Sequence, residues 1–170
     1  MEKVLVLYPE SLDALTVSAG ILDATGRKGE AREFYKRALA VEPESRHLRL
    51  SYAANLASTG SLKEAIGIYE SLIADFPGEQ AFYQYAGIAS SYLGEFDRAV
   101  SFLRRAVDIA PTPTGFFNLA VAYEKSGDLK NAAATFRAYL ERYPKEKESE
   151  RRAAQAELEN LERKIGGASR

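Results

Sequence analysis

The chain of 170 residues contains no cysteine, no tryptophan and a single histidine, His47. Because there is no thiol, disulfides, thiol catalysis and thiolate metal sites are excluded within the chain. A lone histidine without cysteine does not form the usual zinc or non-haem iron sites. No spacing of acidic residues marks a paired-carboxylate site either. We therefore expect a chain with no metal, no cofactor and no catalytic activity of its own.

A strong charge of either sign is also missing, since 23 lysines and arginines face 24 aspartates and glutamates. This balance gives no field that attracts phosphates, so we expect neither nucleic acid nor an anionic membrane surface as the partner. The apolar runs are much shorter than the roughly 20 residues that span a bilayer, and the N-terminus lacks the layout of a signal peptide. We expect a soluble protein without membrane insertion. Its compartment stays unknown, with the cytoplasm slightly favoured.

Glycine and proline are scarce, with 12 and 6 residues, but they recur at a fixed spacing. The clearest copy of the pattern ends at Pro144 and consists of two helical patterns separated at Gly127. A glycine, an alanine, a large apolar residue and a proline recur as Gly26, Ala31, Tyr35 and Pro43; Gly60, Ala65, Tyr69 and Pro77; Gly94, Ala99, Leu103 and Pro111; and Gly127, Ala132, Phe136 and Pro144. The period is about 34 residues, and only the last interval is shorter, by a single position. In each copy the glycine ends one helix, the alanine lies early in the next, and the proline closes the pair.

This pattern resembles the tetratricopeptide repeat (TPR) family, whose unit is a helix-turn-helix of about 34 residues. The resemblance implies an all-α fold, a right-handed α-solenoid or superhelix of four TPR helix-turn-helix repeats with a C-terminal capping helix. The repeats are expected at residues 12–45, 46–79, 80–112 and 113–146, followed by the capping helix at 147–165 and a disordered tail at 166–170. In the capping helix, one face carries Ala154, Leu158, Leu161 and Ile165 at helical spacing.

Residues 1–11 are interpreted as the remnant of a preceding repeat. Pro9 lies one repeat period before Pro43, in register with the other repeat-ending prolines, and the segment before it reads EKVLVLY. That segment would be the last turns of a helix. A short strand is the alternative, because Val4–Leu7 is rich in residues that favour strands. The helix interpretation leaves open that the chain was cut from something longer.

In the TPR family a concave groove is lined by helix A, the first helix of each repeat. Carried onto this chain, the resemblance implies a peptide-binding groove formed by Leu50, Ala54, Gln84, Ile88, Phe117, Asn118 and Val121. Several of these residues are more apolar than solvent-facing positions usually are, and exposed apolar patches mark interaction sites. Some family members grip a partner's C-terminal carboxylate with a clamp of basic and amide side chains. Here the corresponding positions are not basic, and only Asn118 keeps a suitable side chain.

Two functions remain open. The first is a non-catalytic protein–protein interaction module that binds an apolar or amphipathic peptide or helix in the concave groove. The second is an architectural role, as a spacer or self-assembly tail of a larger multidomain protein, with a homo-oligomer formed through the N-terminal edge. Both functions require a protein partner. They differ in solution, because a partner-binding chain stays monomeric as its concentration rises and an assembly tail does not.

Overall fold

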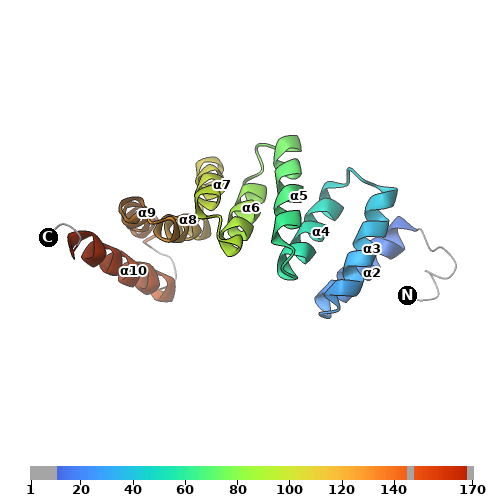
Figure 1. Ribbon diagram of the computed structural model, residues 1–170, viewed down its shortest axis with the longest axis horizontal. Helices are drawn as coiled ribbons and strands as arrows, with labels where there is room; N and C mark the ends of the chain where they lie inside the picture. Colours follow the sequence, from blue (N-terminus) through green and yellow to red (C-terminus); the bar gives the residue numbers. More distant parts are fainter. Residues whose placement is uncertain (1–10, 145–147, 168–170) are drawn as a thin grey trace. The chain divides into compact units, whose positions relative to one another are not determined.

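The computed structural model describes residues 11–144 and 148–167, and every regular element in these ranges is an α-helix (Figure 1). The all-α repeat fold expected from the sequence is thereby confirmed. The chain divides into two compact units, unit 1 from Met1 to Pro77 and unit 2 from Gly78 to Arg170. The predicted remnant before Ser11, with its choice between helix and strand, lies outside the described residues.

Unit 1 is built from helical hairpins. In the first, α2 (Leu12–Ala24) packs against α3 (Lys28–Val41), and in the second, α4 (Arg46–Ser58) packs against α5 (Leu62–Asp75). The two hairpins meet through α3 and α4, so the second helix of one repeat contacts the first helix of the next. We call the first helix of a repeat helix A and the second helix B.

Unit 2 repeats this arrangement and ends differently. Its hairpins are α6 (Gln80–Leu93) with α7 (Phe96–Ile109), and α8 (Pro113–Ser126) with α9 (Leu129–Arg142). The hairpins meet through α7 and α8, and a longer helix, α10 (Glu148–Gly167), packs on α9. Helix α10 extends past the expected end at 165, and residues 168–170 of the predicted tail lie outside the described residues.

The turn within each hairpin depends on a glycine in the left-handed region. Gly26, Gly60, Gly94 and Gly127 have φ angles of +82°, +85°, +84° and +87°. A side chain with a β-carbon disfavours this conformation, so glycine ends helix A and reverses the chain without strain. The predicted glycine stops are confirmed at all four positions.

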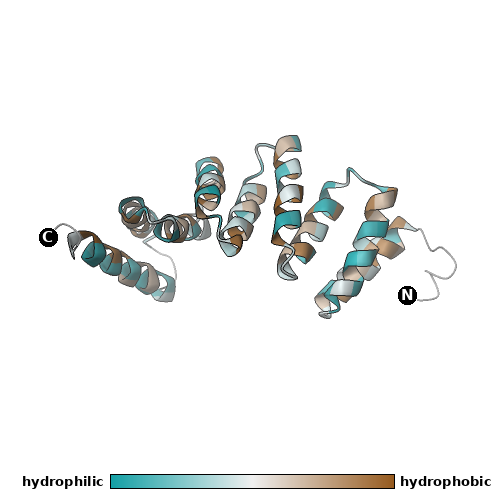
Figure 2. Cartoon of the chain, in the orientation of Figure 1, coloured by the Kyte–Doolittle hydropathy of each residue, from teal (hydrophilic) through white to brown (hydrophobic). Residues whose placement is uncertain are grey.

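Small residues lie where helix A and helix B cross. Ala19 and Ala31 in the first hairpin are fully buried, as are Ala120 and Ala132 in the fourth. Gly87 of α6 shows how close the helices come, because a β-carbon added there would lie 2.6 Å from Leu103 Cγ of α7. Along helices such as α3 and α10, brown hydrophobic turns alternate with teal hydrophilic ones, as expected for helices that bury one face (Figure 2).

Helix α10 buries the predicted apolar face. Ala154, Leu158 and Leu161 join the same hydrophobic cluster as residues of α8 and α9, and Ile165 packs at its edge. The guanidinium of Arg151 donates hydrogen bonds to the Leu140 and Tyr143 carbonyls at 2.9 and 2.7 Å, so it satisfies acceptors at the end of α9.

Replacing Gly87 with alanine is expected to lower the free energy of unfolding by about 1–3 kcal/mol, because the new methyl group meets Leu103 in a packed interface. Circular dichroism melts measure the effect. The matched control is Gly20→Ala on α2, where a β-carbon would meet nothing within 4 Å. That change removes backbone freedom from the unfolded chain and should raise the free energy of unfolding by about 0.5–1 kcal/mol. Equal melting temperatures for the two variants would contradict the close crossing of α6 and α7.

Shortening Leu161 to alanine should lower the free energy of unfolding by about 2–5 kcal/mol, because the side chain is buried in the cluster and its removal leaves a cavity. Glu159→Ala, on the exposed side of the same helix, should change the free energy of unfolding by no more than about 0.5 kcal/mol. Denaturant titration of both variants measures the difference. An unchanged midpoint for Leu161→Ala would mean that α10 is detached from α9 in solution.

Candidate functional site

A pocket of about 450 Å³ opens between α6 and α8 in unit 2, and we call it the α6–α8 pocket. Its lining consists of Ile88, Ser91 and Tyr92 from α6, Phe96 and Leu103 from α7, and Asn118, Val121 and Lys125 from α8. Three of the predicted groove residues, Ile88, Asn118 and Val121, are therefore brought together at one place.

Equivalent positions of two successive repeats form the walls of this pocket. Ile88 and Val121 are one repeat apart, and so are Tyr92 and Lys125. Helix α7 supplies the floor, where Leu103 is 1% exposed. The repeat period thus places two branched apolar side chains on facing helices, above a third that is already packed.

Polar groups at the rim of the pocket have no partner in the described part of the chain. Neither the Asn118 amide nor the Lys125 ammonium forms a hydrogen bond or ion pair with another described residue. The Tyr92 ring is 80% exposed. An apolar floor with a few unpaired polar groups around it has the chemistry of a binding pocket.

A second hollow of about 450 Å³ adjoins the first, with Phe96 and Lys125 in common. It lies at the turn after α6, and its charged lining includes Glu95 and Arg98, whose carboxylate and guanidinium are 2.8 Å apart. Lys125 therefore stands between an apolar pocket and a surface of mixed charge.

Sequence reasoning did not assign Tyr92, Phe96 or Lys125 to the site. One signal for Tyr92 was available in Ser90, which takes the repeat position of Tyr123. Ser90 is fully buried, and its hydroxyl has no hydrogen-bond partner among the described residues. A serine at a core position followed by a tyrosine two positions later indicates that the aromatic ring has moved from the core to the surface.

Phe117 points to a different place from its neighbour Asn118. Its ring packs edge-on against Phe136 and Tyr139, with 5.5 and 6.4 Å between ring centroids. It lines a separate hollow of about 260 Å³ that includes Ala153 of α10. One residue along a helix is a rotation of about 100°, so adjacent residues of α8 face two different neighbours.

The other predicted residues also lie outside the α6–α8 pocket. Gln84 accepts a hydrogen bond from the Gln80 amide at 2.5 Å, so its carbonyl oxygen is already engaged. Leu50 and Ala54 lie on α4 in unit 1, where Leu50 is half-buried and Ala54 is exposed.

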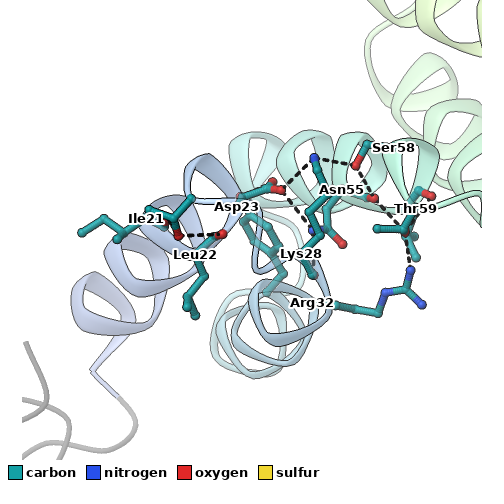
Figure 3. Close-up of polar contacts among 11 residues, drawn as sticks. Ile21, Leu22, Asp23, Lys28, Arg32, Asn55, Ser58 and Thr59 are labelled. Atoms are coloured by element: carbon teal, nitrogen blue, oxygen red, sulfur yellow. Dashed lines mark hydrogen bonds and ion pairs between the residues drawn. The ribbon is translucent and has the colours of Figure 1, made fainter.

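Unit 1 carries polar side chains between its two hairpins (Figure 3). We call Asp23, Lys28, Asn55 and Ser58 the polar cluster. The Lys28 ammonium donates to the Asp23 carboxylate at 3.3 Å and to the Ser58 hydroxyl at 2.9 Å. The Asn55 amide donates to the Asp23 carboxylate at 3.3 Å and to the Lys28 carbonyl at 3.0 Å. These bonds join α2, the start of α3 and α4.

The Tyr35 hydroxyl extends this network and donates to the Asp23 carboxylate at 3.4 Å. Burial and the neighbouring Asp23 charge raise the pKa of Tyr35 above its usual value. The phenol therefore stays neutral and remains a donor throughout the physiological pH range.

The polar cluster and the α6–α8 pocket share positions in the repeat. The equivalent pairs are Asp23 and Ser91, Lys28 and Phe96, and Ser58 and Lys125. In unit 1 these side chains bond to one another, whereas in unit 2 they surround an open apolar space. The same place between repeats is thus closed by polar bonds in one unit and open in the other.

The sequence model of the tetratricopeptide repeat family matches residues 21–80 and 86–147. The chain belongs to the tetratricopeptide repeat family. Its helical hairpins, turn glycines and small residues at the helix crossings are the features of that fold.

Two curated relatives match parts of the TPR region. A segment of 64 residues is 38% identical to Uncharacterized protein y4yS of Sinorhizobium fredii, covering 38% of this chain and 35% of that protein. A segment of 87 residues is 31% identical to Protein O-mannosyl-transferase TMTC1 of Homo sapiens, covering 51% of this chain and 10% of that protein. The chain therefore spans only a minor part of the length of either relative.

Among solved structures, the crystal structure of MamA protein matches with a TM-score of 0.78 and 21% identity, over 85% of this chain and 79% of that one. At this identity the likeness concerns the fold alone. A TPR solenoid generally serves as a protein-interaction scaffold, so the fold implies protein partners.

The described residues hold neither a metal-binding cluster nor a membrane-spanning helix. No group of three or more histidine, aspartate or glutamate side chains is placed there to hold a metal ion. None of the helices described combines the length and the apolar character needed to cross a membrane.

Proposed function

We propose that the chain is an interaction module that holds an apolar or amphipathic partner segment in the α6–α8 pocket. The observation that carries this proposal is the apolar pocket whose rim bears unpaired polar side chains. One bulky apolar side chain of the partner would pack on Leu103 between Ile88 and Val121. Full burial of such a side chain contributes about 1.5–3 kcal/mol, which corresponds to roughly tenfold to hundredfold in affinity.

The polar rim would orient the partner. Asn118 can bond to the backbone of the bound segment, and Lys125 favours an acidic group beside the buried apolar one. The Asn118 amide has no hydrogen-bond partner among the described residues, so it can bond to a peptide backbone without breaking a bond inside the protein. Leu50, Ala54, Gln84 and Phe117 remain predicted contacts outside the α6–α8 pocket.

A displayed library of random peptides, selected on the immobilised full chain, tests the proposal without a known partner. We expect enriched peptides to share one large apolar residue. Their affinity, measured by fluorescence anisotropy, should fall at least about tenfold for Val121→Asp and for Ile88→Asp, because a carboxylate then faces the apolar floor. The matched control is Val41→Asp, the same chemical change at an exposed position of α3.

The outcomes separate binding at the pocket from binding elsewhere. Circular dichroism should show that all three aspartate variants are folded. Peptides that bind Val121→Asp as tightly as the parent chain would place their site outside the α6–α8 pocket. Failure to enrich any sequence would contradict peptide binding. Ala54→Asp measures separately the contribution predicted for α4.

Binding at this pocket should depend weakly on salt and should show a negative heat-capacity change. Most of the contact area is apolar, and Lys125 is the one charged side chain among the described lining residues. Isothermal titration calorimetry with an enriched peptide at several temperatures and two salt concentrations measures both quantities. An affinity that collapses between low and moderate salt would indicate a charged surface as the site.

Self-assembly through the N-terminal edge is a second candidate function, and it is favoured by exposed apolar side chains on α2. On this helix Val17 and Ile21 lie one turn apart and are 53% and 47% exposed. Sedimentation velocity over a hundredfold range of concentration tests this candidate. A concentration-dependent dimer that Ile21→Asp abolishes would support it, and a monomer at all concentrations would exclude it.

A further inference from the structure

Lys125 at the rim of the α6–α8 pocket carries a positive charge that no other described residue pairs with. The neighbouring carboxylates are engaged elsewhere. Glu124, beside it in the chain, accepts a hydrogen bond from the Lys164 ammonium of α10 at 2.8 Å. Glu95, in the adjoining hollow, accepts one from the Arg98 guanidinium at 2.8 Å. These bonds leave the Lys125 ammonium available to a group from outside the protein.

Asp97 shares the adjoining hollow with Lys125, but it has its own source of stabilisation. It lies in the first turn of α7, where the free backbone N–H groups and the helix dipole favour a negative charge. No ion pair joins Asp97 to Lys125 in the described part of the chain. The carboxylate that pairs with Lys125 is therefore left to a partner.

The pocket residues of α8 lie at different heights along the helix. Asn118, Val121 and Lys125 follow one another at intervals of three and four residues. At 1.5 Å per residue, these intervals correspond to about 4.5 and 6 Å along the helix axis. Val121, which forms a wall of the pocket, lies between the two polar side chains. We call the partner's apolar side chain in this pocket the anchor; it would have the Asn118 amide towards one end and the Lys125 ammonium towards the other.

The Asn118 amide favours an extended partner over a helical one. A primary amide both donates and accepts hydrogen bonds, so it suits a backbone with free N–H and C=O groups. In an α-helix these groups are bonded to one another, and little bonding capacity remains for Asn118. In an extended segment they are free to bond. An unpaired amide at the rim therefore matches an extended backbone.

The position of Lys125 agrees with the same conformation. An extended segment rises about 3.3 Å per residue, and its side chains alternate, so residues two apart point the same way about 6.6 Å from each other. This spacing is close to the distance of about 6 Å between Val121 and Lys125 along α8. In a helical partner, the residue on the same face would instead be three or four positions from the anchor.

We propose that the partner is an extended segment with an aspartate or glutamate two residues from its anchor, and that Lys125 selects this acidic residue. The inference rests on the proposed function, because it places the anchor in the α6–α8 pocket. Ion pairs at exposed positions are weak, so the acidic residue should strengthen binding by about twofold to fivefold. The anchor supplies most of the affinity, and Lys125 determines which apolar segments are preferred.

Selection of the random-peptide library on two further variants of the full chain tests this preference. On the parent chain, we expect an acidic residue two positions from the shared apolar residue. The preference should disappear on Lys125→Gln and change to lysine or arginine on Lys125→Glu. The matched control is Lys130→Glu, the same charge change at an exposed position of α9 outside both hollows, and it should keep the acidic preference.

Affinities of single peptides measure the ion pair directly. An enriched peptide with glutamate two residues from its anchor is compared with the same peptide carrying glutamine there. Fluorescence anisotropy should show that the glutamate strengthens binding to the parent about twofold to fivefold and has no effect on binding to Lys125→Gln. Asn118→Ala should weaken both peptides equally, by about twofold to tenfold, because it removes bonds to their backbone.

The outcomes distinguish this inference from the proposed function. Enrichment of an apolar residue without an acidic preference, or an acidic preference that persists on Lys125→Glu, would overturn selection by Lys125 and leave the pocket as the binding site. An acidic residue three or four positions from the anchor would overturn the extended conformation. The absence of any enriched sequence would contradict both proposals.

Discussion

The close approach of helix A to helix B within each repeat is the constraint on which both units depend. It requires a residue with little or no side chain at the crossing, such as Ala19 against α3 or Gly87 against α7. Once the backbones are this close, larger residues such as Leu103 fill the space around the crossing at the density of a protein interior. A single hairpin still leaves apolar residues uncovered, so successive hairpins pack on each other within each unit, and α10 packs with one apolar face on α9.

This shared framework leaves the contact between successive repeats free to vary in chemistry. In unit 1, Asp23 and Lys28 form an ion pair that also bonds to the Asn55 amide nitrogen and the Ser58 hydroxyl, so these donors and acceptors engage one another. In unit 2 the pocket opens at the same positions, and Asn118 and Lys125 keep their bonding capacity. Groups already bonded within the protein gain little from a partner, whereas unpaired groups beside an apolar floor gain more. The fold supports both arrangements, and the side chains decide which unit offers a pocket.

Much of the fold was predictable because the signals are local. A glycine that ends a helix acts through its own φ angle, as at Gly26, and an alanine at a helix crossing acts through its own volume, as at Ala31. The apolar face of α10 follows from helical spacing alone. The candidate site was predicted only in part. Ile88, Asn118 and Val121 lie together, but Phe117 packs toward α9, and Tyr92 and Lys125 were not anticipated.

The sequence by itself determined the number and period of the repeats, the end of each helix A at its turn glycine and the small residues at the crossings. Each of these depends on the conformational preference or size of a single residue, repeated at a regular spacing. Only the tertiary structure decided which exposed side chains share a pocket. That choice depends on the distance and direction between side chains one repeat apart, such as Tyr92 and Lys125, and on what each helix already contacts. The tertiary structure also decided that equivalent positions form a closed polar cluster in unit 1 and an open apolar pocket in unit 2. Which side chains bond to each other depends on how the helices pack.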